Sequence, residues 1–323
     1  MRICIVGAGA IGGLTGAWFA RAGHEVGLVA RGAHLEALRR DGLTLVSGGR
    51  RETFRMRASA EPADFGVQDA VLICLKAYSI APMLPRLKAM VGPETMVVPA
   101  INGLPWWYFY REGGRFDGAT IDCLDPRSEM FAALDPKHII GCVVHGAAEV
   151  AEPGVITHTG GNRFVVGEPD RSASARVQRL AAAMNAAGFD TPIAQDIRVE
   201  VWTKLVGNLS YNPVAALTLA HMQEINRNAG LLALIRALIE ESMRVAEAYG
   251  ARMPMTVEER IGITKKLGNS RISMHQDIDR RRPLEIDAIV GAVVELARKA
   301  GIATPMIDLV QALIAERASH LDR

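Results

Sequence analysis

Apolar residues follow two different periods along this chain. Up to about residue 195, short apolar runs alternate with turn residues, which predicts buried strands separated by helices. The runs that predict strands lie at 3–6, 23–30, 42–47, 70–75, 95–99, 139–144 and 164–167, and a helical pattern covers 173–187. Strands that alternate with helices predict an α/β fold with a doubly wound, mostly parallel sheet, whose ligands bind at the carboxyl ends of the strands.

Beyond Pro192 the strand-like runs stop, and apolar residues recur every three to four positions. This period predicts helices at 196–220, 230–249, 255–267, 286–299 and 305–319, with Asp196 as the N-cap of the first. We therefore predict an α/β domain over residues 1–195 and an all-helical domain over 196–323. Because no long flexible linker joins them, we expect the two domains to pack directly around a substrate cleft.

The first apolar run leads into three glycines at GxGxxG spacing, Gly7, Gly9 and Gly12. Gly7 allows a sharp turn off the strand, Gly9 lets the backbone approach a pyrophosphate, and Gly12 lets the next helix lie close to the strand. A helical pattern and a second strand-like run follow, which completes a βαβ unit of about 30 residues. This context favours a Rossmann-type dinucleotide-binding domain over another kind of glycine-rich turn.

The end of the second predicted strand indicates which dinucleotide binds. NAD sites place an acidic residue there for the ribose 2′-hydroxyl, whereas NADP sites use a cation for the 2′-phosphate. Here Arg31 follows the strand, and the nearby acid, Glu25, lies before it. Since arginine offers a bidentate fork to a phosphate, NADP(H) is the expected cofactor. The alternative is a solvated loop arginine.

Composition narrows the expected partners. The formal net charge is +2 and 22% of residues are charged, so no strong field indicates a nucleic-acid or membrane partner. The four cysteines are widely spaced without a CxxC pair, which is typical of buried thiols in a reducing compartment. The apolar runs are too short for a membrane span, and a strand that begins at residue 2 leaves no room for a signal peptide. We therefore expect a cytoplasmic protein. We also expect no metal site, because no cluster of His, Cys, Asp or Glu has the spacing of metal ligands.

Residues 198–217 place three polar side chains on one face of a predicted helix. Lys204, Asn208 and Asn212 are four residues apart and so follow one another along that face. Asparagine is a mediocre helix former and Pro213 lacks an N–H group, so a kink is expected beside Asn212. A solvated stripe would more often carry Glu, Lys and Arg, and these residues therefore favour a functional face over a solvated one.

A further segment places Ser273 and Glu285 on either side of three consecutive arginines. Pro283 ends a helix there and leaves Glu285 near the start of the next, where the helix dipole stabilises a carboxylate. Glu285 is therefore either a helix-start acid or a site residue, and the arginines are most simply a solvated charge run. His145 and His158 are weaker acid–base candidates, because histidines beside strands are usually satisfied polar residues.

Together these segments resemble the ketopantoate reductase family, the 2-dehydropantoate 2-reductases, over nearly the whole chain. The matching motifs, in order, are GAGAIG at 7–12, Arg31, LKAY at 75–78, NG at 102–103, EVWTKLVGN at 200–208, NP at 212–213, SMHQD at 273–277 and LEID at 284–287. Several motifs in the right order are far more specific than the glycine motif alone.

The resemblance implies an NADP-dependent oxidoreductase that reduces a small 2-oxo acid, 2-dehydropantoate, to (R)-pantoate in pantothenate and coenzyme A biosynthesis. It implies Lys204 as the proton donor and Glu285 as a second catalytic residue, and it leaves a homodimer possible. The implied cofactor-binding residues are Gly7, Ala8, Gly9, Ala10, Ile11, Gly12, Arg31, Lys76, Asn102, Ala148 and Glu285. The implied substrate-binding residues are Asn102, Lys204, Asn208, Asn212 and Ser273.

Two departures from the family pattern keep alternatives open. A substrate-binding asparagine expected eighteen residues after the lysine falls on Met222, so that contact is absent or is made by His221. The aromatic block from Trp106 to Tyr110 either fills a core under a loop or shapes the pocket for a different 2-oxo acid. The alternatives are an NADPH-dependent reductase of another 2-oxo acid, a related 3-hydroxyacid or opine dehydrogenase, and a non-catalytic NADPH-binding sensor.

Overall fold

The computed structural model describes residues 1–266, 268–269 and 271–321, and the chain divides into two compact units. Unit 1 comprises Met1–Ile101, Trp107–Ala119 and Ser128–Ile197, and unit 2 comprises Asn102–Trp106, Thr120–Arg127 and Arg198–Arg323. Two short stretches from the first part of the chain therefore belong with the helices of the second. This exchange matters for function, because one of the stretches begins with Asn102.

A five-stranded parallel sheet forms the centre of unit 1. Its strands run in the order β5-β2-β1-β6-β7, and every neighbouring pair is parallel. Their bounds are β1 Arg2–Val6, β2 Glu25–Val29, β5 Arg57–Ser59, β6 Ala70–Ile73 and β7 Met96–Pro99. β6 and β7 are buried throughout and β1 from its second residue, as expected for strands covered on both faces. The predicted α/β fold with a parallel sheet is confirmed.

Unit 1 also contains a second, mixed sheet, which the sequence did not predict. Its order is β4-β3-β9-β8, with bounds β3 Leu43–Ser47, β4 Arg50–Phe54, β8 Gly141–Glu152 and β9 Val155–Gly167. The runs at 42–47, 139–144 and 164–167 lie here and not in the parallel sheet. β8 and β9 pair antiparallel across a tight turn at Gly154, which has a φ of +83°. The apolar pattern predicted β3 and parts of β8 and β9, but it predicted neither β4 nor the partners of these strands.

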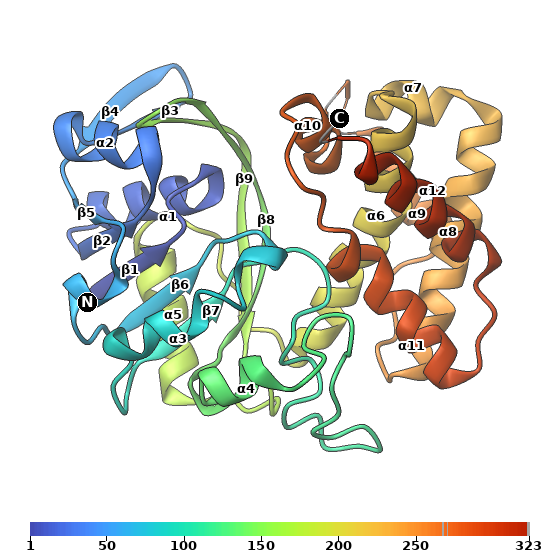
Figure 1. Ribbon diagram of the computed structural model, residues 1–323, viewed down its shortest axis with the longest axis horizontal. Helices are drawn as coiled ribbons and strands as arrows, with labels where there is room; N and C mark the ends of the chain where they lie inside the picture. Colours follow the sequence, from blue (N-terminus) through green and yellow to red (C-terminus); the bar gives the residue numbers. More distant parts are fainter. Residues whose placement is uncertain (267, 270, 322–323) are drawn as a thin grey trace. The chain divides into compact units, whose positions relative to one another are not determined.

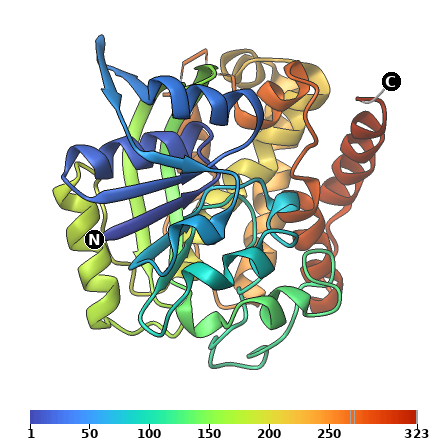
Figure 2. The ribbon, with the colours of Figure 1, turned by 60° about the vertical axis from the view of Figure 1, so that its left-hand side comes forward.

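Helix α1 (Ala10–Arg21) lies between the two sheets, as Figures 1 and 2 show. Glycines on α1 leave room for the sheet on each side of the helix. A Cβ atom on Gly13 would come within 2.7 Å of Ile156 in β9, and one on Gly16 within 2.9 Å of Leu28 in β2. Small residues on both sides of the helix therefore allow both sheets to approach it closely.

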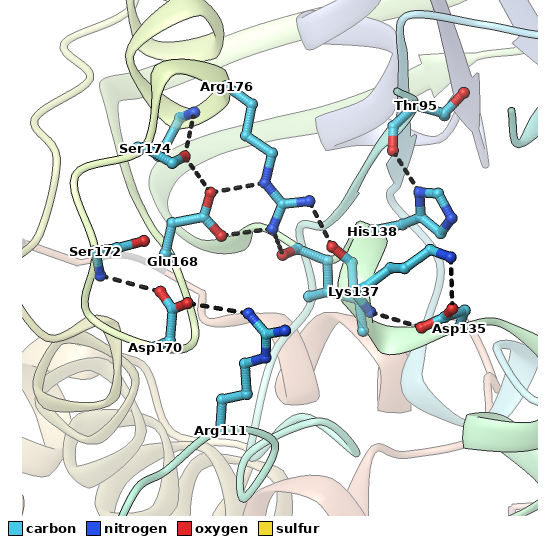
Figure 3. Close-up of polar contacts among 12 residues, drawn as sticks. Thr95, Arg111, Asp135, Lys137, His138, Glu168, Asp170, Ser172, Ser174 and Arg176 are labelled. Atoms are coloured by element: carbon cyan, nitrogen blue, oxygen red, sulfur yellow. Dashed lines mark hydrogen bonds and ion pairs between the residues drawn. The ribbon is translucent and has the colours of Figure 1, made fainter. Parts of the chain in front are cut away.

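An ion pair with a buried carboxylate connects the end of β9 to helix α5 (Ala175–Ala186). Arg176 donates from Nε and Nη2 to Glu168, at 2.7 and 2.6 Å, and Glu168 is only 3% exposed (Figure 3). Arg176 also donates to the carbonyl oxygens of Lys137 and Ile139, just before β8. The other helices of unit 1 are α2 Gly32–Asp41, α3 Leu84–Leu87, α4 Glu129–Ala133 and the 3₁₀ turns Pro62–Phe65, Ala77–Ser79, Lys88–Met90 and Pro136–His138.

The described elements of unit 2 are helical. They are α6 Ile197–Thr218, α7 Met222–Arg227, α8 Ala229–Ala248, α9 Val257–Lys265, α10 Ser273–Asp279, the π-helical turn η5 Asp287–Gly291, α11 Ala292–Ala300 and α12 Pro305–Ser319. α8 and α12 match the predicted helices within one residue, and α6 continues through Pro213. The helix predicted at 255–267 is shorter, and residue 267 lies outside the described residues. In the described ranges, no helix is both long and apolar enough to cross a bilayer.

Candidate active site

The glycine loop of unit 1 lies between β1 and α1. Gly7 has a φ of +97°, and a Cβ atom on Gly12 would lie 2.0 Å from the Gly7 carbonyl oxygen. Gly9 is exposed, and a Cβ atom there would meet nothing within 4 Å. The first turn of α1 starts at Ala10, contains no acidic residue, and directs N–H groups that lack helical acceptors toward this open side. The loop therefore suits a pyrophosphate.

Ala8 and Ile11 complete this loop, Ala8 buried and Ile11 half-buried. The N–H groups of Gly7 and Ala8 donate to the carbonyl oxygen of Val29, at 3.1 and 3.0 Å, which fastens the loop to the end of β2. The backbone contacts with the ligand must therefore come from the part of the loop that begins at Gly9.

Arg31 and Lys76 lie at the same edge of the parallel sheet as the glycine loop. Arg31 is exposed and is the N-cap residue of α2, two positions beyond β2. Lys76 is half-buried and follows β6, the other neighbour of β1. Ala148 lies elsewhere, in β8 of the mixed sheet, half-buried against the core of unit 1. The structure thus gathers Arg31 and Lys76 near the loop, and it places Ala148 on the second sheet.

The two histidines of unit 1 have different surroundings. His158 contacts the Ser47 hydroxyl through Nδ1, at 3.0 Å, and the Gly161 carbonyl oxygen through Nε2, at 2.8 Å. Its ring also makes an edge contact with Trp18. Because both ring nitrogens are engaged, His158 is a satisfied polar residue. His145 is exposed in β8.

Unit 2 brings together three of the predicted site residues. The Nζ atom of Lys204 in α6 donates to Oδ1 of Asn102 at 2.9 Å. The Nδ2 atom of Asn102 donates in turn to Oε2 of Glu285, at 3.3 Å. Glu285 is 4% exposed and directly precedes the helix that leads into η5, whereas Lys204 and Asn102 are half-buried. Asn102 therefore connects an ammonium group to a carboxylate.

Backbone packing holds Asn102 in this position. Gly103 has a φ of +81°, and a Cβ atom there would lie 2.3 Å from the carbonyl oxygen of Ala288 in η5. That same oxygen accepts a hydrogen bond from the N–H of Leu104 at 2.8 Å. The π-helical turn therefore holds the segment after Asn102, and such turns are frequent at functional sites. Our sequence analysis quoted Gly103 only as part of a motif, and it could not have indicated Ala288.

A second pair of polar residues joins a later turn of the same helix to α10. Nδ2 of Asn212 donates to the Ser273 hydroxyl at 3.3 Å, and Asn212 is 4% exposed. Asn208 is half-buried and lies between Lys204 and Asn212 on this face. Lys204 and Asn212 are eight residues apart, or about 12 Å along the helix axis. The face therefore offers an ammonium group at one end and an amide with a hydroxyl at the other.

Of the residues that depart from the family pattern, Met222 and residues 106–109 are buried, whereas Tyr110 and His221 are half-buried. Met222 is 4% exposed, and His221 accepts a hydrogen bond from Nε of Arg271 at 3.1 Å. The aromatic residues Trp106, Trp107, Tyr108 and Phe109 are all at most 3% exposed. Their burial favours a packing role. Within the described ranges, no group of three or more His, Cys, Asp or Glu side chains could hold a metal ion.

Comparison with known proteins identifies the family. The model described as "Ketopantoate reductase PanE/ApbA" matches residues 3–171, and "Ketopantoate reductase PanE/ApbA C terminal" matches residues 196–318. The chain belongs to the ketopantoate reductase family. It is 43% identical over 319 residues to the 2-dehydropantoate 2-reductase of Mesorhizobium japonicum, which covers 98% of each protein.

Solved structures of ketopantoate reductases have the same fold. A candidate ketopantoate reductase from Ralstonia solanacearum matches with a TM-score of 0.94 and 37% identity, over 99% of this chain and 98% of the other. The 2-dehydropantoate 2-reductase of Geobacter metallireducens matches with a TM-score of 0.86 and 27% identity, over 98% and 99%. The resemblance inferred from the motifs is therefore confirmed.

Proposed function

We propose that this ketopantoate reductase family member reduces 2-dehydropantoate to (R)-pantoate with NADPH, and that Lys204 donates the proton. The observation that carries the proposal is the hydrogen-bonded series of Lys204, Asn102 and Glu285 in unit 2. These residues come from three distant parts of the chain, and the series places an ammonium donor beside an amide of fixed orientation.

The chemistry of Lys204 fits the reduction of a carbonyl group. Bound NADPH would supply the hydride to the carbonyl carbon. Negative charge then develops on the carbonyl oxygen, and an ammonium group can stabilise that charge and give up a proton. Asn102 restricts the position of the Lys204 ammonium through its Oδ1 atom, and Glu285 restricts Asn102. Asn208, Asn212 and Ser273 would orient the rest of the substrate, a contribution of geometry.

The residues of unit 1 fit a phosphorylated dinucleotide. The free N–H groups at the start of α1 would hold the pyrophosphate of NADPH, and Arg31 would hold its 2′-phosphate. Arg31 is exposed at the correct edge of the sheet. Lys76, at the same edge, is a second cation for the cofactor. Contacts of Ala148 with the cofactor stay a prediction.

Two alternatives have less support. Burial of the aromatic residues that follow Asn102 weakens the argument for a different 2-oxo acid. A sensor without turnover would have no need for an ammonium donor that is held in place on a polar helix face. The domain limits at 195 and 196, the substrate cleft, the homodimer and the cytoplasmic location stay predictions.

Replacing the proton donor tests the proposal. We expect Lys204→Ala to lower kcat with 2-dehydropantoate at least a hundredfold, because general acid catalysis contributes about 10²–10⁴. NADPH affinity, measured by fluorescence titration, should stay within about twofold. Lys265→Ala, which removes an exposed lysine of α9, is the matched control and should behave like the wild type.

Two outcomes would contradict the proposal in different ways. Near-normal turnover of Lys204→Ala would assign the proton to another group. Tight NADPH binding by the wild type, with no NADPH oxidation by 2-dehydropantoate or any other 2-oxo acid, would favour the sensor.

A further inference from the structure

A half-buried arginine beside α6 has no role in the site described above. Arg260, in α9, packs against α6 at Gly207. A Cβ atom built on Gly207 would lie 1.5 Å from Nη2 of Arg260 and 2.3 Å from Cζ. Only glycine at this position leaves room for the guanidinium group.

The guanidinium group of Arg260 has no partner among the described residues. Its Nε atom is buried without a hydrogen bond, and no ion pair or hydrogen bond joins Arg260 to the described part of the chain. Other arginines of unit 2 do have carboxylate partners: Arg236 contacts Glu258, and Arg271 contacts Asp279 at 3.1 Å. A buried donor without an acceptor is costly, and an anion from outside the chain would supply the acceptor that the Nε–H group lacks.

Tyr211, which interacts electrostatically with Arg260, does not fill this role. The Tyr211 hydroxyl accepts a hydrogen bond from Thr264 at 2.7 Å and donates to Asn226 at 3.0 Å. Its proton is therefore already donated within unit 2, and a neutral hydroxyl does not neutralise the charge of Arg260. Burial lowers the pKa of Arg260, although an arginine side chain still carries its charge at neutral pH.

The position of Arg260 relates it to the candidate active site. Gly207 follows Lys204 by three residues and directly precedes Asn208, so it lies about one turn of α6 from Lys204. The guanidinium group therefore lies beside the polar face that carries the proton donor. A 2-oxo acid has its carboxylate on the carbon next to the carbonyl group, so an anion site close to the proton donor suits this substrate class.

We propose that Arg260 binds the carboxylate of the 2-oxo acid and that Gly207 provides the space for it. The inference rests on the proposed function, because it assigns the substrate of that same site. Arginine binds carboxylates through two parallel N–H donors, which fixes the orientation of the substrate as well as its charge.

Substrate charge gives a direct test. Arg260→Met keeps the alkyl chain and removes the charge. With 2-dehydropantoate its KM should rise roughly 10- to 100-fold, the loss expected for a hydrogen bond to a charged group. With the lactone of 2-dehydropantoate, whose carboxyl group is esterified internally, kcat/KM should change less than about threefold. Equal losses on both compounds would overturn the proposal.

Two further variants separate contact from structure. Gly207→Ala keeps Arg260 but displaces its guanidinium group, so it should raise KM for 2-dehydropantoate although alanine favours the helix. Arg252→Met is the control, because Arg252 is 88% exposed and should affect neither compound. A normal KM in Gly207→Ala would count against the assigned position.

Thermal unfolding without substrate tests Arg260 independently of the proposed function. If Arg260 binds a ligand and does not stabilise the free protein, Arg260→Met should unfold at the same temperature as the wild type or about 2–4 °C higher. A drop of several degrees would make Arg260 a structural residue and overturn the proposal.

If 2-dehydropantoate proves not to be a substrate, sodium 2-oxobutanoate with NADP⁺ should still raise the unfolding temperature of the wild type and not that of Arg260→Met. Equal increases in the unfolding temperatures of the wild type and of Arg260→Met would overturn the proposal.

Discussion

The hydrogen bonds that hold the candidate proton donor join residues far apart in the sequence. Lys204 contacts a residue 102 positions earlier, and Asn102 contacts one 183 positions later. An amide suits the middle position because it offers an acceptor to the ammonium and a donor to the carboxylate at once. These contacts orient the donor before substrate arrives, so none of that ordering has to occur during the reaction.

The cofactor preference also depends on one residue. We expect the wild type to favour NADPH over NADH at least tenfold, since losing a phosphate-binding fork costs about 1.4 kcal/mol or more. Arg31→Ala should raise KM for NADPH and leave KM for NADH almost unchanged, as measured by initial rates with each cofactor. Arg50→Ala, which removes an exposed arginine of β4, is the control. Equal losses with both cofactors would remove Arg31 from the phosphate site.

The close approach of two elements holds the candidate site together. The turn after Asn102 lies against η5, and the N–H of Leu104 and the missing Cβ of Gly103 both meet the carbonyl oxygen of Ala288. Glu285 lies two residues before this π-helical turn. The backbone contact therefore fixes the distance between Asn102 and Glu285, and the side-chain hydrogen bond follows from it.

A methyl group at Gly103 should separate these two elements. Gly103→Ala should destabilise unit 2 and lower kcat at least tenfold, because both its positive φ and its 2.3 Å approach to Ala288 exclude a Cβ atom. Gly118→Ala is a matched control, since Gly118 also has a positive φ, +75°, but open space around it. It should cost about 1 kcal/mol of stability and leave kcat intact. Normal turnover in Gly103→Ala would show that the contact does not position Asn102.

Across the whole molecule, hydrogen-bonded carboxylates make stability depend on pH. In unit 1, the hydroxyl and N–H of Ser172 and the guanidinium of Arg111 lower the pKa of Asp170 (Figure 3). In unit 2, burial acts to raise the pKa of Glu295, but hydrogen bonds from Lys299 and from the N–H groups of residues 122 and 123 outweigh it and lower the pKa. A carboxylate with a lowered pKa stabilises the fold above its unfolded pKa and loses that contribution in acid.

Acid unfolding should reveal the contribution of Glu295. Glu295→Gln should lower Tm at pH 7 by about 3–6 °C, the range for losing hydrogen bonds to a charged group. The difference from the wild type should shrink as the pH falls below about 4.3, where the unfolded state takes up the proton, and should vanish below the folded-state pKa. Scanning calorimetry from pH 7 to 3 measures this, with exposed Glu94→Gln as the control. A difference that stays constant with pH would assign the loss to packing.

The sequence alone determined the features that depend on neighbouring residues. The apolar periods predicted the parallel strands other than β5 and the long helices of unit 2, and the GxGxxG spacing predicted a loop in which Gly7 and Gly12 have the expected conformation and packing. The four-residue spacing placed Lys204, Asn208 and Asn212 on one helix face. Such patterns are readable because backbone geometry repeats over a few residues.

Only the tertiary structure decided which distant residues meet. The sequence did not reveal the mixed sheet, because the apolar pattern of a strand does not indicate which strand it pairs with. It assigned Asn102 to the first domain, whereas the structure groups it with the helices through Gly103 and Ala288. Nor did it single out Arg260, whose Nε atom is buried without a hydrogen-bond partner. These features depend on packing between residues that are far apart in the chain, and local periodicity contains no information about that packing.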